Sequence, residues 1–158
     1  MKLQVKSNFS FSKLAKEMPN ILKKYSEGAG KGAASGIKNA LEKGSYDRLK
    51  DSTTDIRRRG QSPSARFMKT NSKKPLIHTG RLRDSIRQGK DGVKMLEYGV
   101  DQNDGFKVAS SGFSRKFHTV GKKVPHRPFI NEGLAAKTPE SLQAEIDLFK
   151  NMRRAIRK

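Results

Sequence analysis

The sequence predicts an α+β domain in which a small antiparallel sheet of three to five strands packs against a long helix in the N-terminal half and a helix at the C-terminus. Residues 19–41 and 138–156 carry apolar side chains at three- and four-residue steps, the spacing of an amphipathic helix. Between these stretches, short alternating runs separated by polar turns are typical of strands. The 158 residues fit a single domain, residues 1–158, with one hydrophobic core.

The N-terminal third is predicted to hold an edge strand and two helices. Residues 2–6 alternate apolar and polar side chains, which is a strand pattern. A short helix should begin after Ser10 or Ser12 and stop before Pro19, which then fits the first turn of a second and longest helix because its missing N–H is not needed there. The apolar stripe of that longest helix is Ile21, Leu22, Tyr25, Ala29, Ala33, Ile37, Ala40 and Leu41.

Four glycines lie inside the predicted long helix, at Gly28, Gly30, Gly32 and Gly36. Each interior glycine costs about 1 kcal/mol relative to alanine. The glycines therefore indicate either a break in the helix or a face that another part of the chain approaches closely, and we favour a continuous helix lying flat on the sheet. A glycine-rich phosphate loop is not indicated, because neither the dinucleotide-binding pattern nor a Walker lysine is present.

Residues 44–75 are predicted to form a basic extended loop or an extension of the long helix. Tyr46, Leu49 and Ile56 continue the helical phase, and a polar, basic stretch follows them. Loops of this length are usually functional or disordered, and we expect this one to order only against a partner. The candidate contacts with DNA or a partner protein are Arg57, Arg58, Arg59, Lys73 and Lys74.

Two short motif segments frame the predicted sheet. In residues 76–86, Thr79 is expected to cap a short helix that places Leu82 and Ile86 on one face. In residues 124–130, the prolines favour an extended connector that delivers Phe129 and Ile130 to the core.

Between the two motif segments, residues 92–100 and 106–109 are predicted to pair as a hairpin across the polar loop 101–105. The final helix is predicted to begin after Thr138, with Pro139 and Glu140 in its first turn. Its predicted apolar stripe is Leu142, Ile146, Phe149, Met152 and Ile156.

The formal charge of +20 is large for a domain of this size. Residues 57–94 contain twelve basic residues and two acids, and residues 150–158 contain five basic residues and no acid. Such a field attracts polyanions and repels copies of itself. Solvated surface is one interpretation of the basic runs, and contact with nucleic acid or an acidic protein surface is the one we favour.

The sequence supports no enzyme class, and it predicts no cofactor and no metal site. His78, His118 and His126 lie far apart, without metal-ligand spacing, and Asp101 and Asp104 fit the needs of a turn. The absence of cysteine excludes disulfides within the chain. No apolar run approaches the roughly 20 residues of a membrane span and no secretion signal is apparent, so we expect a soluble chain that is not exported.

Four elements, in this order and spacing, resemble the tail-completion and virion-morphogenesis proteins of tailed bacteriophages. They are TGRLRDSI at residues 79–86, YGV at 98–100, FHTVG at 117–121 and PHRPF at 125–129. With the flanking helices the resemblance covers most of the chain, and PHRPF is its more specific part. Residues 44–72 are longer and more basic than the family pattern. The motif residues with a structural role are Thr79, Gly80, Leu82, Arg83, Ser85, Ile86, Pro125, Arg127, Pro128 and Phe129.

The resemblance implies a structural virion protein at the neck, where the head joins the tail. It implies a homo-hexameric ring around the DNA channel, assembled in the host cytoplasm, with other neck and tail proteins as partners and weak contact with duplex DNA. Arg83 would pair within or between subunits, or contact DNA. The alternative function is a general basic nucleic-acid-binding protein, associated with ribosomes or the nucleoid.

Overall fold

The computed structural model describes residues 10–44, 51–61, 69, 76–77, 79–107 and 123–157. The predicted α+β class is confirmed: a long N-terminal helix and a C-terminal helix accompany short antiparallel strands. In chain order the elements are α1 (Phe11–Lys43), α2 (Asp51–Arg58), α3 (Arg81–Ser85), β1 (Arg87–Gly89), β2 (Gly92–Lys94), α4 (Glu97–Asp104), β3 (Phe106–Lys107), β4 (Lys123–Val124), α5 (Phe129–Ala135) and α6 (Pro139–Ile156).

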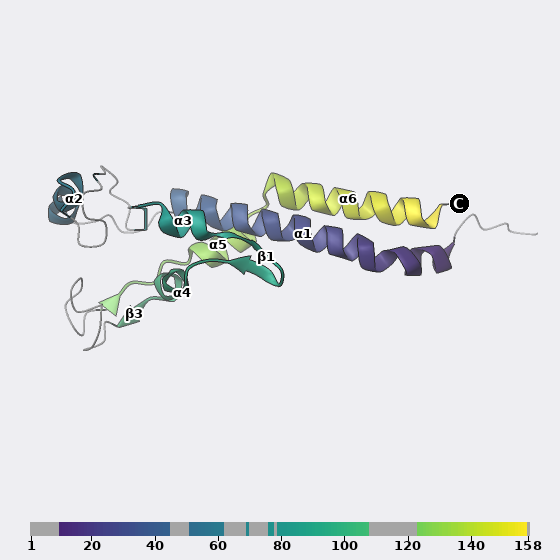
Figure 1. Cartoon of the computed structure of the whole chain (residues 1–158), viewed down its shortest axis with the longest axis horizontal. Coiled ribbons are helices and arrows are strands. Elements are labelled where there is room, and N and C mark those ends of the chain that lie inside the picture. Colours follow the sequence, from purple (N-terminus) through teal and green to yellow (C-terminus); the bar gives the residue numbers. More distant parts are fainter. Residues whose placement is uncertain are drawn as a thin grey trace, which may run out of the picture.

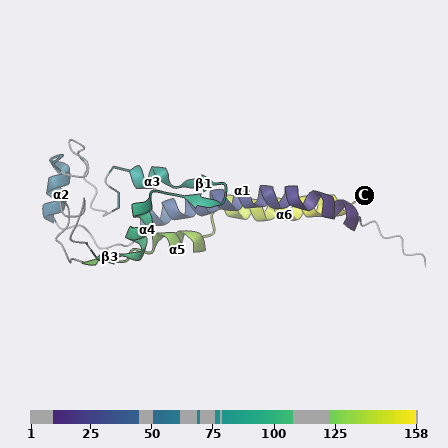
Figure 2. The same cartoon turned by 60° about the horizontal axis from the view of Figure 1, so that its bottom comes forward.

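The molecule consists of a two-helix arm and a compact head. In the arm, the N-terminal half of α1 runs antiparallel to α6, and in the head α3, α4, α5 and the β1–β2 pair surround the C-terminal half of α1 (Figure 1). The second view shows the same division, with α2 at the end of the molecule farthest from the arm (Figure 2). One helix, α1, therefore connects the two parts.

Helix α1 is continuous through Pro19, which corrects the prediction of two helices separated there. An interior proline removes one backbone hydrogen bond and crowds the preceding turn. Packing offsets this cost, because α6 lies along the arm and the Ile156 carbonyl accepts a hydrogen bond from the Ser10 N–H at 3.1 Å. The start of α1 is thus fixed by tertiary contact as well as by its own turns.

The glycines of α1 mark close approach, as predicted, although the neighbours are mostly helices rather than the sheet. A Cβ on Gly28 would lie 2.7 Å from the Cβ of Ala144, and one on Gly32 would lie 2.7 Å from the Ser141 backbone nitrogen. Gly30 alone of the four faces a strand, with Gln88 of β1 nearest to it. Small residues at four-residue spacing therefore allow α6 to lie almost against the α1 backbone.

The tightest contact joins α1 to α5 inside the head. A Cβ added to Gly36 would lie 2.2 Å from the Gly133 carbonyl oxygen, and one added to Gly133 would lie 2.3 Å from the Ile37 Cα. Neither neighbour is a side-chain tip that could move aside. Both glycines are therefore required for the two backbones to cross at this distance.

The hydrophobic core lies in the head. Its buried members come from α1, from the short helix α3 with the residue after it, and from the start of α5. They are Ala34, Ile37, Leu41, Leu82, Ile86 and Phe129. The segments that contribute them lie far apart in the sequence, so this cluster holds α1, α3 and α5 together.

In the part of the chain that the structure describes, the strands form two separate two-stranded pairs, which corrects both the single sheet and the predicted hairpin. β1 pairs with β2 in the register Gln88 to Val93, and β3 pairs with β4 in the register Phe106 to Val124. Residues 97–104, predicted as part of a strand and a loop, form helix α4. Its buried Gly99 lies against Leu82, where a Cβ would meet the Leu82 Cδ1 at 2.7 Å, so packing on α3 favours the helix over the strand.

Helix α6 begins as predicted but packs on α1 with a different face. The Thr138 hydroxyl accepts a hydrogen bond from the Ser141 N–H at 3.3 Å, and the Ser141 hydroxyl accepts one from the Thr138 N–H at 3.0 Å. The buried residues of α6 are the small Ala144 and Ala155, and at Ala144 the close approach of Gly28 on α1 leaves no room for a larger side chain. The predicted stripe residues Leu142, Ile146 and Phe149 are exposed.

Several predictions lie outside the described residues. They concern the edge strand at residues 2–6, Lys73 and Lys74, residues 108–109 of the predicted hairpin and the FHTVG element at 117–121.

Candidate functional site

The first motif segment forms α3 and places two side chains in the core. Gly80 adopts a left-handed conformation with φ of 75° and stands at the N-cap position, so α3 begins one residue later than a Thr79 cap predicts. The Thr79 hydroxyl still accepts a hydrogen bond from the Arg81 N–H at 3.3 Å. Leu82 is 2 % exposed and Ile86 has no exposed surface, as the four-residue spacing predicts.

Two polar side chains of the first motif attach α3 to its neighbours. The Ser85 hydroxyl donates to the Leu82 carbonyl at 2.7 Å and accepts from the Leu96 N–H at 3.2 Å, which joins α3 to the start of α4. The Arg83 guanidinium pairs with Glu42 on α1 at 3.3 Å and with Asp84 at 2.8 Å. The pKa of Arg83 is raised, chiefly by the hydrogen bond and charge of Asp84. Arg83 therefore pairs with carboxylates of its own subunit.

The second motif segment crosses from β4 to α5 and ends in the core. Phe129 has no exposed surface and is the largest of the fully buried side chains. The backbone before it is tied to α4, because the Arg127 N–H donates to the Asn103 carbonyl at 3.1 Å and the Arg127 guanidinium donates to the Gln102 side-chain carbonyl. Pro128 stands at the N-cap position of α5 and provides no side-chain acceptor there.

Asn103 supplies the missing acceptor, and its role was not predicted from the sequence. Its side-chain oxygen accepts from the Ile130 N–H at 2.9 Å, while its amide nitrogen donates to Asp104 at 2.7 Å. Asn103 is only 4 % exposed, unlike a residue in a polar hairpin loop. The sequence signal was the Asn itself, a strong N-cap residue that here caps a helix distant in the chain.

The two motif segments therefore meet as parts of one core. Leu82 and Ile86 of the first and Phe129 of the second belong to the same buried cluster, against Ile37 and Leu41 of α1. Both segments are also hydrogen-bonded to α4, the first through Ser85 and the second through Asn103. The arrangement fixes the shape of the head.

The candidate DNA or partner contacts in residues 57–59 lie at the end of α2 and in the turn after it, rather than in an extended loop. Arg57 is buried at 9 % exposure, and burial lowers its pKa from the ordinary value. Arg58 pairs with Asp55 at 3.1 Å, and both side chains are exposed. Arg58 and Arg59 are thus the accessible cations of this group.

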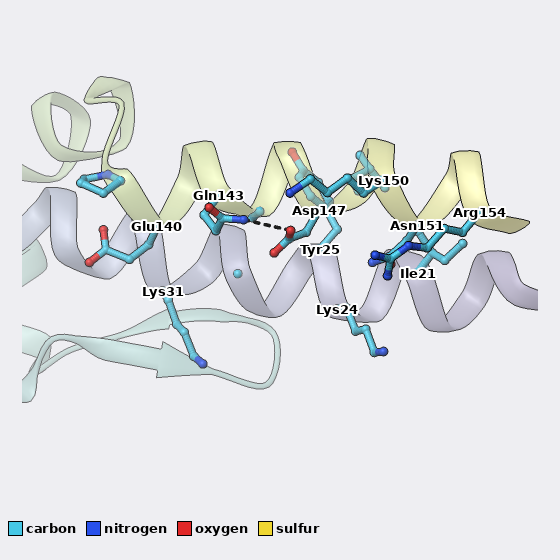
Figure 3. A pocket seen from close by; sticks show the side chains of 14 residues that line it. Ile21, Lys24, Tyr25, Lys31, Glu140, Gln143, Asp147, Lys150, Asn151 and Arg154 are labelled. Atoms are coloured by element: carbon cyan, nitrogen blue, oxygen red, sulfur yellow. Dashed lines mark hydrogen bonds between the residues drawn. The ribbon is translucent and has the colours of Figure 1, made fainter.

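A groove of about 770 Å³ runs along one flank of the arm and was not predicted. Its lining includes Gly28 and Ala144, where α6 lies close to α1. Lys24 and Lys31 border it from α1 and Arg154 from α6 (Figure 3). The other charged residues that line it are Lys150, Glu140 and Asp147. Excess positive charge along an open groove suits the weak, salt-dependent binding of phosphates.

In the ranges that the structure describes, no three residues of the metal-binding types His, Asp or Glu gather where they could hold an ion. Within those ranges, too, every helix is too short or too polar to span a bilayer. Comparisons of the chain with protein-family models, with curated proteins and with solved structures each found no match.

Proposed function

We propose that the chain is a structural virion protein of a tailed bacteriophage, a neck or tail-completion subunit. Copies of it would form a hexameric ring at the head-to-tail junction and complete the top of the tail around the DNA channel. Its partners would be other copies of itself and the neighbouring connector and tail proteins. Its action would be adhesive and mechanical, with no bond made or broken.

The observation that carries this proposal is the convergence of the two motif segments on one core. The resemblance assigns the structural role to residues of TGRLRDSI and PHRPF, and Leu82, Ile86 and Phe129 of those motifs are almost fully buried together. Arg83 and Arg127 are likewise engaged within the subunit, with Glu42 and Gln102. Motif residues used to fix a subunit's shape suit a protein that works by fitting against neighbours.

The net charge of +20 favours a second candidate, a general nucleic-acid-binding protein. A neck subunit beside the DNA path would also carry positive charge, but strong binding would slow the passage of DNA. The two candidates therefore differ in the strength of binding and in assembly. Weak contact by a ring supports the first, and tight binding by a monomer supports the second.

Two measurements on the purified chain separate the candidates. Nucleic acid is first removed with nuclease and high salt, and molar mass is then measured by light scattering, alone and after mixing with tail tubes of the encoding phage. Duplex DNA binding is titrated from 50 to 300 mM salt. Rings, or cosedimentation with tail tubes, together with a Kd weaker than about 1 μM at physiological salt, would support the virion role. Submicromolar binding by a stable monomer would support the alternative.

A further inference from the structure

The outer face of α6 carries an apolar stripe that no described part of the chain covers. Leu142, Ile146 and Phe149 are spaced by four and three residues, so they share one face of the helix, and they are 42, 47 and 69 % exposed. The opposite face, with Ala144 and Ala155, packs on α1. Met152 and Ile156, both half-buried, continue the stripe toward the C-terminus.

Charge along α6 is divided between its two halves. Glu140, Glu145 and Asp147 lie in the N-terminal half, and the basic residues lie in the C-terminal half. The latter are Lys150, Arg153 and Arg154. Two copies of α6 laid side by side in the same direction would place like charges together, whereas an antiparallel pair would place the acidic half of each against the basic half of the other. The charge pattern therefore favours an antiparallel pair.

A twofold axis at Phe149 gives this pair a self-complementary register. Phe149 then lies opposite its own copy, Ile146 opposite Met152 and Leu142 opposite Ile156. The same register brings Glu145 opposite Arg153 twice, once on each side of the axis. Both residues are exposed and stand four positions before and after Phe149, on the same face as the stripe.

The shape of the molecule allows this arrangement. The stripe from Leu142 to Ile156 is about 21 Å long at 1.5 Å per residue. It lies on the arm, where α6 has α1 on one side only, and the head adjoins the N-terminal end of α6 (Figure 1). An antiparallel pair of arms would place the two heads at opposite ends, where they do not collide.

We infer that the outer face of α6 is a homodimer interface, in which two copies of the chain pair antiparallel about Phe149. The occupant of the stripe is thus a second copy of α6. The overall charge of +20 opposes self-association, but at 150 mM salt charges more than about 8 Å apart are largely screened, so the local pairing of Glu145 with Arg153 and the apolar stripe decide the outcome. The inference does not depend on the proposed virion function.

Charge reversal combined with mixing tests the register. Sedimentation equilibrium of the nuclease-treated chain alone, without tail tubes, at 150 mM salt should show a monomer–dimer equilibrium. E145R and R153E should each weaken dimerisation about tenfold, because each places like charges together at two symmetric positions. If net charge alone controlled dimerisation, the two variants would change the dimer affinity in opposite directions. E145R raises the net positive charge, whereas R153E lowers it. E27R, the same change at an exposed position of α1, is the matched control and should dimerise like the wild type.

An equimolar mixture of E145R and R153E should recover wild-type affinity as a heterodimer, and the double variant should recover it as a homodimer. The I146E/F149E variant should be monomeric at all concentrations, with an unchanged circular dichroism spectrum because both side chains are exposed. Three results would each overturn the inference: a wild-type chain that is monomeric throughout, an assembly that I146E/F149E leaves intact, or single reversals that mixing does not rescue.

Discussion

Phe129 has no exposed surface, and its ring joins the PHRPF segment to the core built on α1 and α3. Replacement of a fully buried phenylalanine by alanine removes its transfer free energy and leaves a cavity. We expect Phe129→Ala to lower the free energy of unfolding by about 3 to 5 kcal/mol, as measured by urea titration. Phe11→Ala is the matched control, because Phe11 is 75 % exposed and its loss should change stability by less than about 0.5 kcal/mol. Equal effects of the two substitutions would contradict the assignment of the core.

Substitution of Gly36 tests the close contact of α1 with α5. An added methyl group would meet the Gly133 carbonyl oxygen at 2.2 Å, so the two backbones would have to separate. Gly36→Ala should therefore destabilise the protein by about 2 kcal/mol, despite the higher helix propensity of alanine.

Gly30→Ala on the same helix serves as the control for Gly36→Ala. Its new methyl group would meet only the flexible side chain of Gln88, with the Cγ at 3.1 Å. This variant should be neutral or more stable by up to about 1 kcal/mol. A Gly36→Ala variant as stable as Gly30→Ala would show that the helices do not cross as described.

At the scale of the element, the N-terminus of α6 is held by hydrogen bonds that depend on pH. The pKa of Glu140 is lowered from its ordinary value of 4.5, chiefly by a hydrogen bond from its own backbone N–H and further by the Thr138 and Ser35 hydroxyls. The Ser35 hydroxyl donates to the Glu140 carboxylate at 3.2 Å. Because the pKa is lower in the folded state, this contribution is present above about pH 4.5 and is lost as the pH falls through the folded-state value.

Glu140→Gln should therefore reduce stability at pH 7, and the difference from the wild type should shrink as the pH is lowered from 4.5 to 3. Ser35→Ala should remove part of the same contribution, and in combination with Glu140→Gln it should have little further effect. Urea titrations at pH 7, 5, 4 and 3 measure both. A difference that is constant across this range would mean that the charge of Glu140 does not stabilise α6.

The elements also show which features the sequence could predict. The helical spacing of α1 and α6, the Thr138 cap and the burial of Leu82, Ile86 and Phe129 all follow from local patterns, and each is present. The prediction for residues 97–104 was wrong because a short apolar run fits both the period of a helix and the period of a strand. Packing of Gly99 on Leu82 favours the helix. The Asp91-Gly92 pair, a strong hairpin signal, could have located the β1–β2 turn.

The packed face of α6 could not be predicted from its apolar spacing. The stripe containing Leu142, Ile146 and Phe149 has the larger apolar side chains, yet Ala144 and Ala155 are the buried residues. At Ala144 the glycines of α1 explain this choice, since only a small side chain fits where the two helices lie so close. The role of Asn103 likewise could not be predicted, because the helix that it caps, α5, lies far from it in the sequence.

At the scale of the whole molecule, the accessible cations at the end of α2 can be tested for contact with DNA. Each Lys or Arg that neutralises a phosphate contributes about −0.9 to the slope of log K against log salt concentration. Replacing Arg58 and Arg59 with Gln should make the slope shallower by up to about two, if both contact phosphates. Arg57→Gln is the comparison, because a buried side chain should affect stability more than binding. Unchanged slopes in the Arg58 and Arg59 variants would exclude this surface from the DNA path.

The two motif segments contribute to one core, which fixes the shape of the subunit. Under the proposed function, its outer surfaces fit against copies of itself and other virion proteins. The most direct test is electron microscopy of particles produced by the encoding phage when this chain is not expressed. We predict filled heads and separate tails that fail to join, or tails with an incomplete upper end, restored by the wild-type chain supplied in trans. Complete heads joined to complete tails in its absence would contradict the proposed function.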